Sequence, residues 1–195
     1  MELVTSDDAG RTFARGTRMM KIAIEPGSVQ ETLIIPLYGR KLCAEMFPEL
    51  YRDTSAARIC ANIDYDFIGL DRQAQNALWK FDALEAAMRQ LDMQWEIHDY
   101  LARHPHSAIV NMGCGLDRTG QSCDNGTCRI YNVDMPNIIE ARKLLSPAGE
   151  RELNISSDLN NYSWMDKIDD DERALGSRRE ELVEVALPVG DGAVG

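Results

Sequence analysis

Two glycines and two acids in the middle of the chain have the types and the spacing to hold a nucleoside. Gly113 and Gly115 directly follow the run 108–112, and Asp117 comes two residues later. This run is short, apolar except for one asparagine, and ended by glycine, which predicts a buried parallel strand leading into a tight turn. The glycines let the backbone bend and let a ligand approach where a Cβ would collide. In open α/β sheets, nucleotide-like ligands bind at this carboxyl end of a strand.

The second acid, Asp134, ends the next predicted strand, 129–134. About 20 residues beyond a glycine turn, an acid is placed to accept hydrogen bonds from ribose hydroxyls. The third glycine of a dinucleotide fingerprint is missing, because Arg118 stands there and Gly120 is out of register. Asp117 also puts a carboxylate where a pyrophosphate would be repelled. We therefore expect a ligand with a ribose, a cationic centre and no phosphate, as in S-adenosyl-L-methionine, and disfavour a nicotinamide dinucleotide.

The composition sets limits on the kind of protein. A chain of 195 residues with 44% hydrophobic and 27% charged residues suits one globular domain. Its net charge of −11 argues against nucleic acid or an anionic membrane as a partner. No apolar run approaches the roughly 18 residues of a membrane span, and the first residues lack the pattern of a signal peptide. Five cysteines, an odd number, favour reduced thiols. We expect a cytoplasmic protein that binds neither nucleic acid nor membrane.

Helices are predicted before the glycine turn. Apolar residues at helical spacing predict a helix that begins near Pro36. Arg40 and Lys41 lie on it, either on a solvated face or in contact with an acidic group. Asp53 is a typical N-cap. From residue 71 to residue 104 there is no Gly or Pro, and the apolar stripe predicts a helix packed on the core.

After the turn, an alternation of strand and helix is predicted. Segment 118–128 is rich in turn residues and predicts an irregular connection. Cys123 and Cys128 do not have the partners or the spacing of a zinc site. A helix is predicted over 135–145, a third strand over 153–158, and another helix from residue 164 onward.

Several spaced motifs together resemble one family. They are Gly-Arg-Lys near residue 40, the helix that carries Arg89, Ile-Val-Asn-Met-Gly-Cys-Gly-Leu-Asp, Tyr-Asn-Val-Asp-Met-Pro with Ala-Arg-Lys-Leu-Leu, and Ser-Asp-Leu-Asn with Ser-Trp-Met-Asp. In order and separation they resemble the leucine carboxyl methyltransferase family, in its branch of tetracenomycin-type polyketide O-methyltransferases. The resemblance runs from about residue 31 to residue 169.

The resemblance implies a role for particular residues. Arg89 matches the arginine that pairs with the carboxylate of the cofactor S-adenosyl-L-methionine, which a guanidinium fork suits well. Gly113 and Gly115 match the turn against the adenosine, and Asp134 matches the acid that holds the ribose. Asp158 and Leu159 match the pair that flanks the adenine. Either Arg40 or Lys41 matches a basic residue near the cofactor or the acceptor. From the residues alone, Arg89 is an ordinary surface arginine on a helix.

The resemblance implies a Rossmann-like α/β fold of the class I methyltransferases. We expect an N-terminal arm over 1–30, a helical region over 31–106, a cofactor-binding half-domain over 107–169 and a divergent charged and Gly-rich tail over 170–195. The tail does not resemble the family's continuation. We therefore interpret the chain as truncated, with the first three parallel strands in the order 3-2-1 and one edge of the central strand left unpaired. Such an edge favours self-association.

The implied activity is methyl transfer from a sulfonium to the oxygen of a small, polyketide-like molecule. A carboxylate acceptor is already ionised at neutral pH and needs no base, whereas a phenol, with a pKa of about 10, does. We assign no catalytic role to the three histidines. The alternative is a remnant that binds the cofactor without catalysis.

Overall fold

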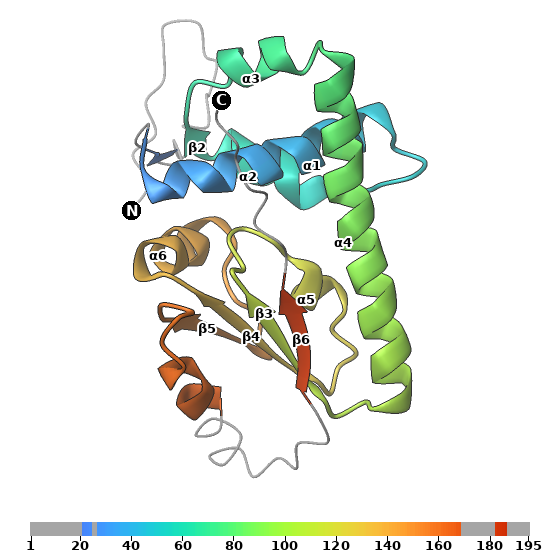
Figure 1. The fold of residues 1–195 in the computed structure, drawn as a ribbon, viewed down its shortest axis with the longest axis vertical. Coiled ribbons are helices and arrows are strands. Elements are labelled where there is room, and N and C mark those ends of the chain that lie inside the picture. The colour runs from blue at the N-terminus through green and yellow to red at the C-terminus, as the bar shows by residue number, and fades with distance from the viewer. Residues whose placement is uncertain (1–20, 25–26, 169–181, 187–195) are drawn as a thin grey trace, which may run out of the picture.

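The computed structural model describes residues 21–24 and 27–168, and the backbone of residues 182–186 (Figure 1). The predicted N-terminal arm lies mostly outside these ranges, and so does most of the predicted tail. None of the described helices is long and apolar enough to cross a membrane.

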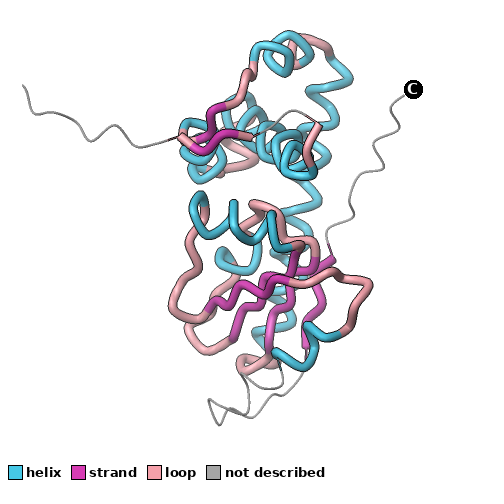
Figure 2. The backbone as a smooth tube through the Cα atoms, turned by 90° about the vertical axis from the view of Figure 1, so that its left-hand side faces the viewer, coloured by secondary structure: helices cyan, strands magenta, loops and turns pink. Residues whose placement is uncertain are grey.

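A helical layer precedes the glycine turn in the chain and lies over the carboxyl ends of the central strands (Figure 1). Its elements are β1 Ile22–Ala23, the 3-10 helix η1 Val29–Leu33, α1 Ile34–Met46, α2 Thr54–Ala61, β2 Ile63–Asp64, α3 Ile68–Gln73 and α4 Ala77–Arg103. The strands β1 and β2 form a small parallel sheet of their own, which Figure 2 shows apart from the main sheet. The long helix α4 leaves this layer and runs beside the main sheet (Figure 1).

The main sheet follows in the chain. Its elements, with the intervening helices, are β3 Ala108–Met112, α5 Thr119–Ser122, β4 Arg129–Asp134, α6 Pro136–Leu145, β5 Glu152–Ser156 and β6 Leu182–Ala186. All neighbouring strands are parallel, and their order is β5-β4-β3-β6. Residues 163–168 are helical after β5.

The fourth strand corrects the expected extent of the sheet. Ala108 at the start of β3 pairs with Leu182 at the start of β6, and Met112 pairs with Ala186. The segment interpreted as a charged tail therefore contributes a strand. The edge of β3 that the truncation hypothesis leaves unpaired is paired, because β4 and β6 flank it on its two sides.

Both faces of β3 and β4 are buried, which explains why their sequences are apolar runs. Ile109 and Ile130 face a cluster that includes Ile97 of α4 and the thiols of Cys123 and Cys128. Residues of alternate positions face the opposite cluster. This cluster contains Val110, Tyr131, Val133, Ile155, Trp164 and Ile168.

Local signals place the helix starts. Asp53 caps α2, because its carboxylate accepts from the backbone N–H groups of Ser55 (2.9 Å) and Ala56 (3.0 Å). Pro36 falls in the first turn of α1, and Pro136 begins α6. These three predicted starts are confirmed.

The long helix predicted from residue 71 is divided. Chain segment 74–76 separates α3 from α4, and the side chain of Asn76 accepts from the N–H of Leu78 to cap α4. The assignment of the whole apolar stripe to the core is wrong in part. Leu78, Phe81 and Trp95 are each more than 60% exposed.

Candidate functional site

The glycine turn after β3 has the backbone conformation for which glycine is best suited. Gly113 has φ +64° and Gly115 has φ +46°, both in the left-handed region that side chains disfavour. The N–H of Gly113 continues the sheet by donating to the carbonyl oxygen of Val133 at 2.9 Å. The turn is therefore an extension of the β3–β4 ladder, held at the carboxyl edge of the sheet.

Asp134 lies beside this turn because it ends the strand next to β3. Its Oδ2 accepts from the N–H of Gly115 at 2.8 Å, and its Oδ1 accepts from the N–H of Met135 at 2.8 Å. A carboxylate has about four acceptor positions, so two remain for a ligand. The side chain is partly exposed and can reach such a ligand.

The chain after β5 reaches the same edge. The N–H of Ser157 donates to the carbonyl oxygen of Asp134 at 2.9 Å. Cδ1 of Leu159 lies 3.9 Å from the point that a Cβ on Gly113 would occupy. Asp158 is exposed, and its Oδ1 accepts from the backbone N–H and side-chain amide of Asn160 at 2.9 and 3.0 Å. The structure thus brings five predicted residues to one edge: Gly113, Gly115, Asp134, Asp158 and Leu159.

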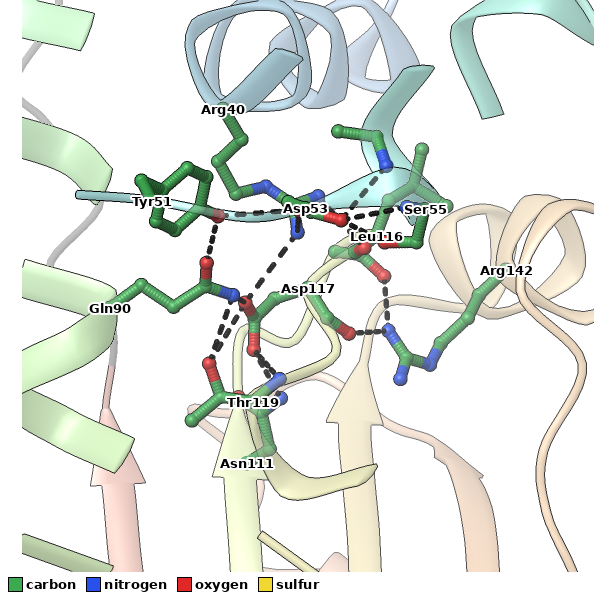
Figure 3. Close-up of polar contacts among 12 residues, drawn as sticks. Arg40, Tyr51, Asp53, Ser55, Gln90, Asn111, Leu116, Asp117, Thr119 and Arg142 are labelled. Atoms are coloured by element: carbon green, nitrogen blue, oxygen red, sulfur yellow. Dashed lines mark hydrogen bonds and ion pairs between the residues drawn. The ribbon is translucent and has the colours of Figure 1, made fainter. Parts of the chain in front are cut away.

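A buried polar network connects the turn to the helical layer (Figure 3). Arg40 of α1 is 6% exposed. Its Nη1 donates to Oδ2 of Asp53 at 3.1 Å, and its Nη2 donates to the carbonyl oxygen of Leu116 at 3.1 Å. Asp53 is partly buried, which opposes ionisation, but Arg40 and the donors of Ser55 and Ala56 hold its pKa below the usual value.

Gln90 of α4 joins this network to Asp117. Its amide nitrogen donates to Oδ1 of Asp117 and to the hydroxyl of Thr119, and its carbonyl oxygen accepts from the hydroxyl of Tyr51. Asp117 also accepts from the side-chain amide of Asn111 at 3.3 Å and from the N–H of Thr119 at 2.8 Å. Burial and the charge of Asp53 raise the pKa of Tyr51, so it remains a protonated donor.

Arg142 of α6 holds the turn from the other side. It is 2% exposed, and its Nη1 donates to the carbonyl oxygens of Gly115 (3.0 Å) and Asp117 (2.5 Å). Sequence reasoning missed this role, as it missed those of Gln90 and Asp53 in fixing the turn. A basic residue in the last turn of a helix has an ordinary explanation in the helix dipole, so no local signal distinguished Arg142.

The structure corrects one expectation about a charged residue and separates two candidates. Asp117 does not face a ligand: it is 8% exposed, and its carboxylate is occupied by the network. Arg40 and Lys41, the two candidates for the basic residue, have different surroundings. Arg40 contacts the segment after the turn, whereas Lys41 pairs with Glu45 on the surface of α1 at 3.1 Å.

Arg89 is exposed on α4 and is not joined to this network by any described hydrogen bond or ion pair. Successive residues of an α-helix are rotated by about 100°, so the orientation that turns Gln90 inward directs Arg89 away. The structure therefore does not bring Arg89 to the glycine turn.

The described histidines lie away from the glycine turn, and the one cysteine in the turn, Cys114, is buried. His98 is exposed on α4, and His104 and His106 lie between α4 and the amino end of β3. All five cysteines are buried and unpaired. Burial raises the pKa of the Cys114 thiol to about 12, so this residue of the turn is no thiolate at neutral pH.

Comparison with known proteins gives one informative similarity. No family model matches the chain. The chain is 28% identical, over 148 residues, to the tetracenomycin polyketide synthesis O-methyltransferase TcmP of Streptomyces glaucescens. The similarity covers 75% of this chain and 53% of that protein. The chain thus spans about half the length of the curated relative it matches, which is a methyltransferase.

Proposed function

We propose that this chain binds S-adenosyl-L-methionine at the glycine turn and transfers its methyl group to an oxygen atom of a small molecule. The observation that carries the proposal is the contact between Gly115 and Asp134, 2.8 Å between N and Oδ2. It places an acid with spare acceptor positions beside a bend formed by two glycines in the left-handed conformation. The similarity to an O-methyltransferase supports the same assignment.

The residues present fit the nucleoside part of this cofactor. Asp134 would accept hydrogen bonds from the ribose hydroxyls, since its two carboxylate oxygens each have an unused position. Leu159 would pack on the adenine. Oδ2 of Asp158 has no hydrogen-bond partner among the described residues and would accept from the exocyclic amine. Arg40 and Arg142 would fix the turn without touching the cofactor, because both are buried against its backbone.

The chemistry favours an acceptor that is already ionised. When bound, the cofactor supplies an electrophilic methyl group next to a sulfonium. The protein then has to align the acceptor oxygen and to exclude water. A phenol would need a base, but His98 is exposed on α4, and His104 and His106 lie near the wrong end of β3. We therefore propose a carboxylate acceptor before a phenolic one.

The second candidate is cofactor binding without methyl transfer. Its support is the extent of the similarity, which covers 53% of the related enzyme and so leaves about half of that enzyme unmatched. For the methyl-transfer function, we also propose a polyketide-like acceptor and a cytoplasmic location.

A turnover experiment separates the two candidates. The chain is incubated with S-adenosyl-L-methionine and a panel of aromatic carboxylic acids and phenols, and the release of S-adenosylhomocysteine is followed. Methyl transfer predicts product formation with at least one carboxylic acid and its loss in Asp134→Ala. Cofactor binding without product on any acceptor would support the second candidate, and absence of binding would refute both.

A further inference from the structure

A polar cleft opens where the helical layer meets the short helix α5. Its volume is about 330 Å³, and it opens between the start of α2, the middle of α4 and the short helix α5. Its lining is polar and includes Arg52, Ser55, Gln94, Arg118, Gln121 and Ser122. It shares no lining residue with Gly113, Gly115, Asp134, Asp158 or Leu159. Four residues of the buried network also line it: Arg40, Tyr51, Asp53 and Gln90. The cleft thus borders the network that fixes the turn but contains none of the residues proposed to contact the nucleoside.

Arg118 is the uncompensated charge in this cleft. It is partly buried, and its side chain makes no hydrogen bond or ion pair with any residue that the structure describes. Burial, together with the nearby guanidinium of Arg58, lowers its pKa, and Arg142 acts in the same sense. Glu152 and Asp53 oppose this without reversing it. Removing a cation from water without a counter-ion is costly, so an anion beside Arg118 would be stabilised.

The other cations of the cleft differ from Arg118 in having partners. Arg40 is neutralised by Asp53 at 3.1 Å, and Arg52 lies 3.8 Å from Glu49 on the surface. The lining also contains the carboxylate of Asp53, which is paired with Arg40, and neutral donors in the side-chain amide of Gln94 and the hydroxyl of Ser122. Among the residues that the structure describes, the cleft therefore offers one free guanidinium and several neutral donors, on a chain whose net charge is −11.

We propose that this cleft is a binding site for an oxyanion, the phosphate or carboxylate group of a small polar molecule, and that Arg118 is its principal ligand. A guanidinium offers two parallel donors that match either group. The volume lies at the lower end of the range for small-molecule sites, roughly 300–1,000 Å³. Such sites are usually apolar, and the polar lining here selects a compact, hydrated anion over an aromatic ligand.

The test is a nuclear magnetic resonance titration of the full chain. Inorganic phosphate and succinate are added in separate experiments, with sodium chloride at matched ionic strength as the reference. We expect a saturable change in the amide signals of Thr119–Ser122 with at least one of the two anions. The anion that binds more tightly shows whether the natural ligand carries a phosphate or a carboxylate group. Arg118→Gln should weaken binding about tenfold or more, since charged hydrogen bonds are the strong ones.

Matched variants keep the result decisive. Arg72→Gln removes an exposed arginine of α3 that does not line the cleft and should leave binding unchanged. Should Arg118→Gln fail to fold, Ser122→Asp puts a carboxylate at an exposed position of the lining and should abolish binding by repulsion. Arg118→Lys should recover part of the affinity that Arg118→Gln loses.

Three results would overturn the proposal. The first is the absence of a saturable change with either anion, and the second is equal affinity of Arg118→Gln and the intact chain for the anion. The third is displacement of the anion by S-adenosyl-L-methionine, which would show that both ligands bind at one site. Saturable anion binding in a chain that does not bind S-adenosyl-L-methionine would support the cleft and refute the proposed function alone.

Discussion

The N–H of Gly115 and Oδ2 of Asp134, 2.8 Å apart, join the bend after β3 to the last residue of β4 across 19 positions of sequence. The contact requires two neighbouring parallel strands that end at the same level, and the register supplies this by pairing Met112 with Val133. It also requires a left-handed conformation at Gly115, where φ is +46°. The position of the acid beside the bend is therefore a property of the sheet and not of a flexible loop.

Gly115→Ala should destabilise the fold by about 1–3 kcal/mol, the usual cost of a non-glycine residue held in a sparsely populated conformation. The new Cβ would also lie 3.1 Å from Cδ2 of Leu33, closer than an ordinary contact. Urea unfolding measures the change. Gly69→Ala is the control, because Gly69 is helical and a Cβ added there would have no neighbouring atom within 4 Å. Equal free energies of unfolding for Gly115→Ala and Gly69→Ala would show that the bend accepts a Cβ at residue 115 without strain.

Arg40→Gln should cost about 3–5 kcal/mol, the range for removing one partner of a buried ion pair. The loss leaves Asp53 without its cation and the carbonyl oxygen of Leu116 without this donor. Lys41→Gln is the matched neighbour, since its pair with Glu45 is on the surface and should be worth less than about 1 kcal/mol. Urea unfolding of both variants decides which cation fixes the turn, and a larger effect at Lys41 would refute the described network.

Asp53 should make the fold sensitive to acid. Its pKa is lowered in the folded state, so its contribution to stability is fully present above the unfolded value of about 3.9 and is lost as the pH falls through the lower folded value. Asp53→Asn should have a lower free energy of unfolding than the intact chain at pH 7. This difference between the two proteins should become smaller below a pH of about 4. Unfolding measurements from neutral to acid pH test this. Asp82→Asn, at an exposed position of α4, is the control and should be as stable as the intact chain at pH 7.

The sequence predicted local structure well because local signals determine it. The strand over 129–134 has the predicted bounds, and the helix over 135–145 begins within one residue of its predicted start. The set of residues at the carboxyl edge of the sheet could be predicted for the same reason. Adjacent parallel strands bring their final residues together, so Gly115 and Asp134 meet once β3 and β4 are recognised.

Long-range partners could not be predicted in this way. The hydrogen bond from Arg40 to the carbonyl oxygen of Leu116 links residues far apart in the chain, and helical periodicity does not predict such a partner. Periodicity also failed to show that Asp117 turns inward, since a residue in an irregular turn has no defined face. The strand β6 was missed because its neighbours in the sequence are charged and its pairing partner, β3, lies far earlier in the chain.

Arg89→Ala should leave the affinity for S-adenosyl-L-methionine within about twofold, because the side chain is exposed and is not directed at the turn. The resemblance implies the opposite, a loss of about 1.5–3 kcal/mol for one charged hydrogen bond. Isothermal titration calorimetry distinguishes the two. A loss of tenfold or more would show that Arg89 reaches the cofactor and that α4 changes its position on binding.

The central claim is that the bend at Gly113 and Gly115 with Asp134 holds a sulfonium nucleoside. Isothermal titration calorimetry with S-adenosyl-L-methionine and, separately, with NAD tests it most directly. We predict saturable binding of S-adenosyl-L-methionine, little or none of NAD, and a loss of about 1.5–3 kcal/mol in Asp134→Asn, whose amide cannot replace the charged acceptor. Saturable binding of NAD without S-adenosyl-L-methionine, or unchanged affinity in Asp134→Asn, would contradict the account.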